Sequence, residues 1–273
     1  MSRRLALALL AASLASPALA DLVLRSESLG LDLVAMSALP AAPQGQGETD
    51  FCSHLFVETV STPGGQDATA KGWHVTAELP LGDLTVVSFV GNATPATSGT
   101  CELLDGNVGF YSGGQLVALL YSTQPDDLMI GRIRPFGNGL RILSGDVLPG
   151  TTADLVRTAD QIAVTDPAKE EPVCNGAATV PEIEGLPIDE ARKRLISAGW
   201  EPVPGDPAQQ SLGFAQDIAS ADVPEVEDCS GTGFGFCAYR YSGPAGELSV
   251  TTAGEGGEDG GLPLVYTYGV DCR

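Results

Sequence analysis

Three arginines lie close together in one short stretch of the chain. Arg132, Arg134 and Arg141 flank Asn138 and Gly139, and an Asn-Gly pair is the strongest short-range signal for a β-hairpin. With these two as the loop residues, the alternation of side chains along a strand puts all three arginines on one face of the hairpin. Guanidinium groups bind carboxylate and phosphate groups bidentately. The spacing therefore predicts an anion-binding face.

The alternative is that these arginines pair with the protein's own carboxylates, for instance Asp126, Asp127 or Asp146. Acids are abundant, because the chain has 35 Asp and Glu against 14 Lys and Arg and a net charge of −21. Such a charge argues against nucleic acid as a partner, since binding to phosphates depends on Lys and Arg. It also argues against adhesion to anionic lipid, and it favours solubility through self-repulsion.

Residues for catalysis or metal binding are sparse. The only histidines are His54 and His74, and a metal site would need further converging ligands. There is no G-x-S-x-G nucleophile motif. Glycines at residues 231–235 lack the lysine of a phosphate-binding loop, and the acidic, glycine-rich residues 254–261 are typical of an exposed loop. We predict no catalytic residue, metal or cofactor; whether the protein is an enzyme stays open, with the balance favouring no catalysis.

The N-terminus has the pattern of a secretory signal peptide. Arg3 and Arg4 precede an apolar run over residues 5–14, and an Ala-Leu-Ala sequence ends at Ala20. The run is much shorter than the ~20 apolar residues of a membrane-spanning helix. We expect cleavage after Ala20 and a protein of bacterial type that is located in the periplasm or secreted, without insertion into a membrane.

Six cysteines follow this segment, an even number that favours disulfides in an exported protein. Six cysteines allow 15 pairings. The domain division below favours Cys52–Cys101 in the first part of the chain. In the second part it favours Cys229–Cys237 and Cys174–Cys272, the last joining the two ends of that part.

Residues 21–167 are predicted to form an all-β domain, sandwich or barrel-like. Residues 73–79 alternate apolar and polar side chains as a half-buried strand does. Residues 107–111 and 115–121 flank a Gly-Gly pair and predict a hairpin. Seven or eight short strands with intervening turns favour a sandwich or barrel over alternating strands and helices.

Residues 168–178 are rich in Pro, Lys and Glu without apolar periodicity, and we interpret them as a linker. Residues 179–273 then form a second domain. It begins with a helix over residues 188–199, followed by candidate strands over residues 236–241, 247–252 and 263–270. The expected fold is a small α+β unit, with one helix packed on a three-stranded antiparallel sheet.

The opening of this second unit resembles the start of a PASTA domain. The resemblance covers residues 178–254 as a single divergent copy with added cysteines, whereas the N-terminal domain resembles no family. It depends on residues 248–254, a closing strand that ends in glycine, and on Val180, Pro181, Gly185, Ala191, Leu195, Ala198 and Gly199. PASTA domains combine a strand, a helix and a small sheet, and they bind or sense peptidoglycan fragments without catalysis. The resemblance thus implies a peptidoglycan-type ligand.

The sequence as a whole favours an exported, disulfide-bonded, non-catalytic protein that binds a cell-envelope component. Its ligand would be a cell-wall glycopeptide or another envelope protein, bound by the PASTA-like domain or by Arg132, Arg134 and Arg141. One alternative is an envelope hydrolase with its site in the all-β domain. Another is an inhibitor or adaptor of a second exported protein.

Overall fold

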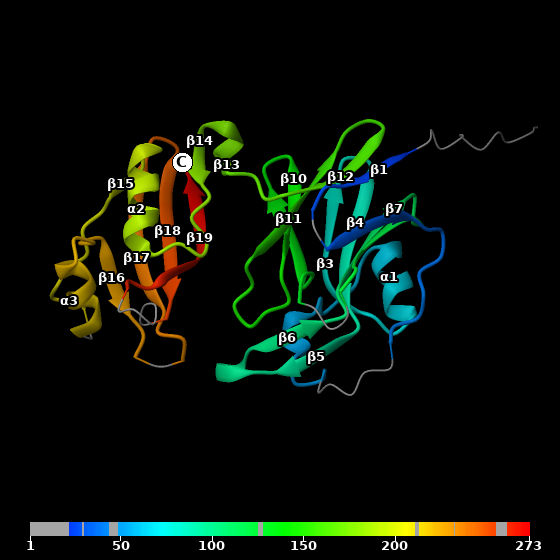
Figure 1. Ribbon diagram of the computed structural model, residues 1–273, viewed down its shortest axis with the longest axis horizontal. Coiled ribbons are helices and arrows are strands. Elements are labelled where there is room, and N and C mark those ends of the chain that lie inside the picture. Colours follow the sequence, from blue (N-terminus) through cyan, green and yellow to red (C-terminus); the bar gives the residue numbers. More distant parts are fainter. Residues whose placement is uncertain are drawn as a thin grey trace, which may run out of the picture.

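The computed structural model describes residues 22–273, apart from residues 29, 44–48, 125–127, 211–212, 232 and 255–260. The predicted signal peptide and its cleavage site lie outside the described residues, as does most of the loop expected over residues 254–261. In the described part of the chain, no helix combines the length and apolar character that crossing a membrane requires. Figure 1 shows that β-strands occur along the entire described part of the chain, from β1 near its N-terminal end to β19 near its C-terminal end.

The first sheet is antiparallel and contains the hairpin that the Gly-Gly pair predicts. Gly113 and Gly114 form the loop between the strands β7 (Asn107–Ser112) and β8 (Gln115–Ser122). Both glycines have a positive φ, of 55° and 84°. Glycine adopts such angles more readily than any residue with a Cβ. The strand order is β2-β8-β7-β4-β3. The five strands are β2 Leu31–Ala35, β3 His74–Leu81, β4 Leu84–Val90, β7 Asn107–Ser112 and β8 Gln115–Ser122.

The second sheet contains the arginine hairpin. Its order is β1-β12-β11-β10-β9, and the first strand pairs in parallel with β12 while the other neighbours are antiparallel. The five strands are β1 Val23–Ser26, β9 Arg132–Phe136, β10 Gly139–Leu143, β11 Thr151–Arg157 and β12 Gln161–Thr165.

These two sheets share one apolar core. Val86 and Phe110 from the first sheet and Ile142 and Leu155 from the second have no measurable solvent exposure. Burying a side chain of this size stabilises the fold by about 1.5–3 kcal/mol. The shared core therefore fixes the second sheet, and the arginine hairpin with it, on the first.

A helix that the strand pattern did not predict packs beside the first sheet. It is α1, Pro63–Ala70, and the Thr62 side chain caps it by accepting a hydrogen bond from the Gly65 amide at 3.0 Å. Gly64 lies so close to the Tyr111 ring that an added Cβ would be only 2.6 Å from it. Small residues thus let a helix of weak propensity pack closely on β7.

Smaller elements close the N-terminal part. The Cys52–Cys101 disulfide joins the region of the first short helix to a two-stranded sheet. These elements are η1 Ser53–Leu55, β5 Asn92–Pro95, η2 Thr97–Gly99 and β6 Cys101–Leu104.

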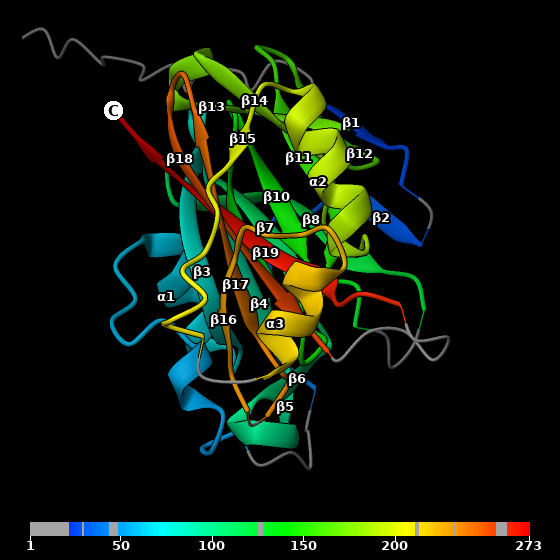
Figure 2. The same ribbon diagram turned by 90° about the vertical axis from the view of Figure 1, so that its left-hand side faces the viewer.

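The C-terminal part has a sheet of its own, in the order β15-β17-β18-β19 with β16 also paired to β17. Figure 2 views this part from outside and shows α2 and α3 on the outer face of the sheet. Its opposite face lies toward the N-terminal part (Figure 1). The elements are β13 Glu170–Val173, η3 Cys174–Gly176, β14 Ala178–Pro181, α2 Ile188–Ser197, β15 Glu201–Pro202, α3 Gly213–Ser220, β16 Val226–Cys229, β17 Cys237–Gly243, β18 Gly246–Ala253 and β19 Leu264–Cys272.

Helix α2 forms where the sequence predicts a helix. Its buried side chains Ile188, Ala191 and Leu195 recur every three or four residues, as one apolar face requires. Pro187 is the N-cap, so the helix begins at Ile188 as predicted. Gly199 follows the C-terminus with a φ of 89°, which ends the helix.

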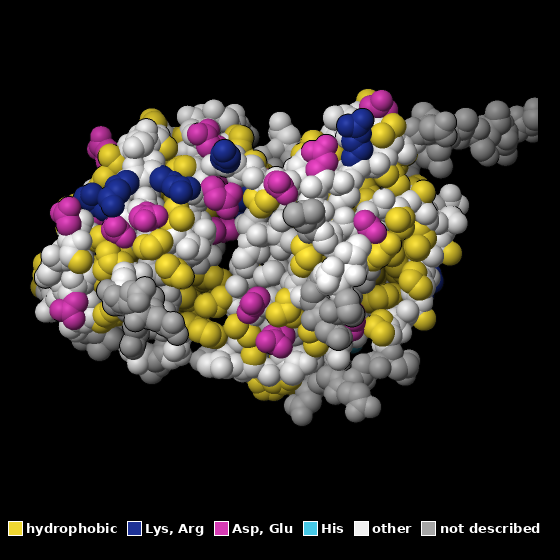
Figure 3. Space-filling model, in the orientation of Figure 1, with side chains coloured by type: hydrophobic (Ala, Val, Ile, Leu, Met, Phe, Trp, Pro, Cys, Tyr) yellow, Lys and Arg dark blue, Asp and Glu magenta, His cyan; other side chains and the backbone are white. Residues whose placement is uncertain are grey.

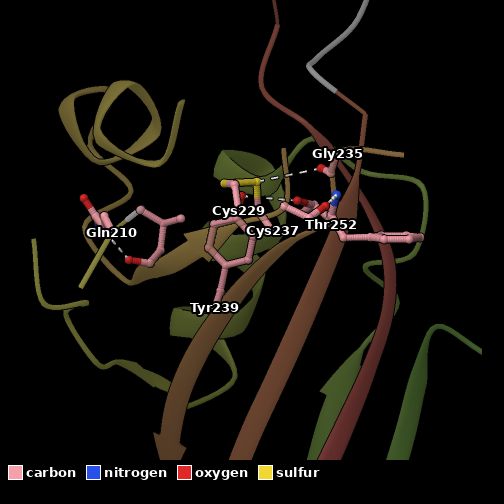
Figure 4. The surroundings of a disulfide bond; sticks show 9 residues. Gln210, Cys229, Gly235, Cys237, Tyr239 and Thr252 are labelled. Carbon is pink, nitrogen blue, oxygen red and sulfur yellow. Dashed lines mark hydrogen bonds between the residues drawn. A yellow bond between two sulfur atoms is a disulfide. The ribbon is translucent and has the colours of Figure 1, made fainter. Parts of the chain in front are cut away.

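The structure pairs the six cysteines as Cys52–Cys101, Cys174–Cys272 and Cys229–Cys237, the same three pairs that the sequence analysis favoured. Cys229 and Cys237 lie directly opposite each other on β16 and β17. Figure 4 shows their disulfide beside Tyr239, whose hydroxyl is 3.2 Å from the Thr252 hydroxyl. Disulfides persist in oxidising compartments, so these bonds agree with a protein located outside the cytoplasm.

The expected fold class is wrong. The chain is mostly β, with 46% of residues in strands and 15% in helices, and its described part has three helices and several sheets without a clear split into an all-β domain and a small α+β domain. Helix α1 lies in the part expected to be all-β. The C-terminal sheet has five strands and carries two helices in place of three strands and one helix.

Long-range pairing explains these differences. β16 is a short strand with two acids, and β15 has only two residues, so neither has an apolar pattern of its own. Residues 168–178, interpreted as a linker, contain β13, which pairs with β14. Domain boundaries near residues 167 and 179 stay a prediction.

Candidate functional site

The arginine hairpin forms with a register that differs by two residues from the expected one. The loop residues are Gly137 and Asn138, since Phe136 pairs with Gly139 and Arg134 pairs directly with Arg141. Gly137 has a φ of 53° and so takes the left-handed position. A shift of two residues leaves every side chain on the same face of a strand. The three arginines therefore share one face, as predicted.

The Arg141 side chain is buried, and its guanidinium is paired with a carboxylate of the protein itself. Its Nε and Nη2 donate to the two carboxylate oxygens of Asp154 at 2.7 and 3.0 Å, and both side chains are at least 95% buried. Its guanidinium also lies 3.5 Å from the centre of the Phe136 ring. Burial lowers the pKa of Arg141, but the hydrogen bonds and charge of Asp154 outweigh it and leave that pKa raised.

The same pair holds the chain where it leaves the N-terminal part. The Ala168 amide donates to Asp154 at 2.7 Å, and its carbonyl accepts from Arg141 at 3.3 Å. Residue 168 leads directly into β13. Arg141 and Asp154 thus fix the path of the chain toward the C-terminal part.

Arg134 continues this contact across the junction. It donates to both carboxylate oxygens of Glu171 in β13, at 3.2 and 3.3 Å. The hydroxyl of Tyr268 in β19 donates to Glu171 at 2.6 Å, and the Arg134 guanidinium lies 5.9 Å from the Tyr268 ring centre. Burial raises the pKa of Tyr268 and the negative charge of Glu171 adds to the rise.

We call these five residues, Arg134, Arg141, Asp154, Glu171 and Tyr268, the arginine clamp. Two of the three arginines expected to bind an anion are therefore neutralised by the protein's own carboxylates. Asp126 and Asp127, which the sequence offered as partners, lie outside the described residues.

Arg132 differs from its two neighbours. Its Nε is buried without a hydrogen-bond partner, and its side chain makes no hydrogen bond or ion pair with any residue that the structure describes. The backbone on both sides is held: the Gly131 carbonyl accepts from Thr76 at 2.8 Å, and the Ile133 amide donates to Ser88 at 3.3 Å. Arg132 thus has a well-held backbone and a guanidinium without a partner among the described residues.

Two adjoining pockets lie where the N-terminal and C-terminal parts meet. The larger, of about 390 Å³, lies between residues 148–151 on one side and residues 182–185 and 264–266 on the other. The smaller, of about 200 Å³, is lined by Arg132 and Arg134 from β9 and by Tyr266 and Thr267 from β19, among others.

Pro149, Glu184 and Tyr266 line both pockets. We call the two together the junction crevice. Figure 3 shows the surface indented between the two parts of the molecule, with acidic side chains beside the indentation. The volume of the larger pocket is within the usual range for small-molecule sites, about 300–1,000 Å³.

The acidic wall of the junction crevice comes from the turn between β14 and α2. The Glu182 amide donates to the Lys169 carbonyl at 2.7 Å, and the Gly185 amide donates to the Val265 carbonyl at 2.8 Å. These bonds hold the turn against β13 and β19 at once. Glu182 and Glu184 therefore face the crevice from a fixed backbone.

Glu182 and Glu184 are satisfied to different degrees. The Thr151 hydroxyl donates to Glu184, which also lies 3.8 Å from Arg134. No described residue donates to the Glu182 carboxylate or pairs with it. Partial burial raises the pKa of Glu182; nearby Glu184 and Asp154 raise it further, against the opposing effects of Arg141 and Arg134.

The histidines do not form a site. His54 is exposed and its Nδ1 lies 3.2 Å from the Phe51 carbonyl, whereas the His74 ring stacks on Phe56 at 4.7 Å. Burial lowers the pKa of His74 against the opposing charge of Asp50. In the described part of the chain, no group of three or more His, Cys, Asp and Glu could hold a metal ion.

Sequence reasoning missed the junction crevice. Glu182 and Glu184 lie within residues 178–254, which resemble a PASTA domain, and Tyr266 lies in the candidate strand over residues 263–270; the sequence marks none of the three as a site residue. Their meeting depends on β19 returning beside residues 182–186, more than 75 positions earlier, and no local pattern announces it. The one sequence feature that pointed to this region was the resemblance of residues 178–254 to a PASTA domain. The turn between β14 and α2, which forms the acidic wall, lies within those residues.

Comparisons with known protein families, with curated proteins and with solved structures found no match to this chain. The resemblance to PASTA domains therefore stays a prediction from the residues quoted above.

Proposed function

We propose that this is an exported, disulfide-bonded binding protein whose junction crevice binds a cell-envelope component of the peptidoglycan type. The observation that carries the proposal is the state of Arg132. Its side chain lines the smaller pocket and makes no hydrogen bond or ion pair with any residue that the structure describes. A ligand that presents an anionic oxygen to this side of the crevice would supply the missing counter-charge.

Two further features support an envelope ligand. The turn that forms the acidic wall lies within residues 178–254, the stretch that resembles a peptidoglycan-binding family. The three disulfides fit an oxidising compartment, where envelope components are found. The strongly acidic chain makes nucleic acid an unsuitable alternative.

The test is co-sedimentation of the mature protein with insoluble peptidoglycan, with bovine serum albumin as the reference for nonspecific retention. The Arg132→Gln variant should bind about tenfold more weakly, since a hydrogen bond to a charged group contributes about 1.5–3 kcal/mol. Lys193→Gln is the matched control, because the Lys193 side chain is 71% exposed on α2 and does not line either pocket of the crevice.

Retention that exceeds albumin, falls in Arg132→Gln and stays unchanged in Lys193→Gln would support the proposal. Retention no greater than that of albumin would overturn it. Retention that is equal in all three proteins would overturn the assignment of the junction crevice as the binding site.

A further inference from the structure

Two charged side chains of opposite sign line the junction crevice without a hydrogen bond or ion pair from any residue that the structure describes. Arg132 lines the smaller pocket and Glu182 lines the larger one. Every other charged side chain of the crevice lining is already paired: Arg134 with Glu171, and Glu184 with Thr151 and Arg134. The crevice thus keeps one free donor group and one free acceptor group, each in a different pocket.

The free state of Glu182 is set by its surroundings. Its backbone is bound on both sides, by the Lys169 carbonyl and by the Arg194 guanidinium at 2.8 Å, so the residue is held in place. Its carboxylate receives no hydrogen bond from any described residue. Glu184 and Asp154 lie near this half-buried carboxylate, and the charges of Arg141 and Arg134 offset burial and these two acids only in part, so a cation in the crevice would be favourable.

The two pockets share Pro149, Tyr266 and Glu184, and the Glu184 carboxylate is already paired with Thr151 and Arg134. Leu148 and Leu264 add apolar surface in the larger one. Leu264 is 43% exposed, which is high for a large apolar side chain in a strand. A ligand that spans the crevice would therefore be apolar or weakly polar between two charged ends.

We infer that the junction crevice takes a short peptide that carries an ammonium group and a carboxylate, with the ammonium group on Glu182 and the carboxylate on Arg132. The inference rests on the proposed function and names the part of the envelope component that the site recognises, which is its peptide.

Other ligand classes satisfy the crevice less well. A neutral glycan chain would leave both charged groups without a counter-charge. A polyanion would meet Glu182 and Glu184 in the larger pocket, and a polycation would meet Arg132 and Arg134 in the smaller one, and like charges at close range repel. Only a ligand with both charges complements both pockets.

The experiment is isothermal titration calorimetry with the free stem tetrapeptide released from peptidoglycan by an amidase. The peptide is used unmodified, with its amino groups acetylated, and with its carboxylates amidated. The proteins are the wild type, Glu182→Gln and Arg132→Gln, whose substitutions keep polar side chains of comparable length. Glu190→Gln and Lys193→Gln, on the exposed side of α2, are the matched controls.

The expected result is a crossed pattern. In the wild type and both controls, acetylation and amidation each weaken binding about tenfold or more. In Glu182→Gln, acetylation has little further effect while amidation still weakens binding. In Arg132→Gln the roles are reversed. Urea denaturation of each variant checks that it is folded.

Equal effects of acetylation in the wild type and in Glu182→Gln would overturn the inference, as would binding of the peptide that neither modification changes. Failure of the tetrapeptide to bind, while insoluble peptidoglycan still retains the wild type and not Arg132→Gln, would overturn the inference and leave the proposed function standing. Loss of retention on peptidoglycan itself would overturn the proposed function.

Discussion

The arginine clamp and the junction crevice are neighbouring regions built on the same face of one hairpin. In the clamp, Arg141 and Arg134 each meet a carboxylate bidentately or nearly so, and Tyr268 completes the coordination of Glu171. In the crevice, Arg132 and Glu182 meet no partner in the described part of the chain. Both regions contain arginine and acidic side chains, so the two regions differ in whether these side chains have partners. The paired charges of the clamp stabilise the fold, whereas the unpaired charges of the crevice are available to a ligand.

A buried glutamate in the C-terminal part also has all its partners within the protein. Glu225 is completely buried, and it accepts from Tyr241 at 2.6 Å and from Arg192 at 3.2 Å. These bonds attach α2 to the C-terminal sheet. Burial of an acid alone therefore does not mark a binding site in this protein.

The largest expected effect comes from breaking the clamp. Arg141→Met leaves the buried carboxylate of Asp154 unpaired and should lower the free energy of unfolding by about 3–5 kcal/mol. Arg132→Met, in the same hairpin, removes a donor that has no partner and should leave stability unchanged or raise it by up to about 1 kcal/mol. Urea denaturation followed by tryptophan fluorescence measures both. Equal losses in the two variants would contradict the distinction between clamp and crevice.

A smaller difference in stability is expected between variants of two tyrosines of β19, Tyr268 and Tyr266. Tyr268→Phe removes the hydrogen bond to Glu171 and should cost about 1.5 kcal/mol, because the acceptor is charged. Tyr266→Phe is the control, since the Tyr266 hydroxyl makes no hydrogen bond with a described residue. Its stability should match the wild type within about 0.3 kcal/mol. A larger loss in Tyr266→Phe would place Tyr266 in the clamp and not in the crevice.

The smallest expected effect is a difference in how stability depends on pH between Glu78, whose carboxylate accepts hydrogen bonds, and Glu182, whose carboxylate accepts none from a described residue. Although partial burial opposes it, hydrogen bonds from Ser61 and Thr62 lower the pKa of Glu78 below its ordinary value of 4.5. The stability that Glu78 contributes is therefore present above pH 4.5 and is lost as the pH falls through the lowered value. Glu78→Gln should cost about 1 kcal/mol at pH 7, and the cost should shrink below pH 4.5.

Glu182 should behave in the opposite way, because its pKa is raised. The folded state then carries a penalty for the charged carboxylate, absent below pH 4.5 and complete above the raised pKa. Glu182→Gln should stabilise the protein at pH 7, and the gain should vanish as the pH falls to 4.5 and below. Unfolding measured between pH 3 and pH 7 tests both variants. A loss of stability in Glu182→Gln at pH 7 would mean that Glu182 has a structural partner.

Local patterns were enough to predict much of the structure. Gly113 and Gly114 located one hairpin, the apolar spacing of Ile188, Ala191 and Leu195 located α2, and alternation located β3. The shared face of the three arginines was predicted correctly even though the register was shifted, because a strand repeats every two residues.

Contacts between distant segments could not be predicted. Asp154 and Glu171 neutralise two arginines from 13 and 37 positions away, and only the packing of β11 and β13 brings them there. Helix α1 contains two glycines and has little apolar periodicity, so it depends on the close approach to Tyr111. Glu182 and Arg132 meet one crevice from residues 50 positions apart. The fold class failed for the same reason, since β13, β15 and β16 are strands only because of their neighbours.

The most direct test of the account is nitrogen-15 NMR of the arginine Nε–H groups during titration with soluble peptidoglycan fragments released by a muramidase. The Arg132→Gln variant assigns the Arg132 signal by its absence. We expect the Arg132 signal to shift progressively to saturation, while the Arg141 signal stays in place because Asp154 holds that guanidinium inside the protein. An Arg132 signal that does not move at fragment concentrations up to the millimolar range would contradict the claim that the junction crevice is the binding site.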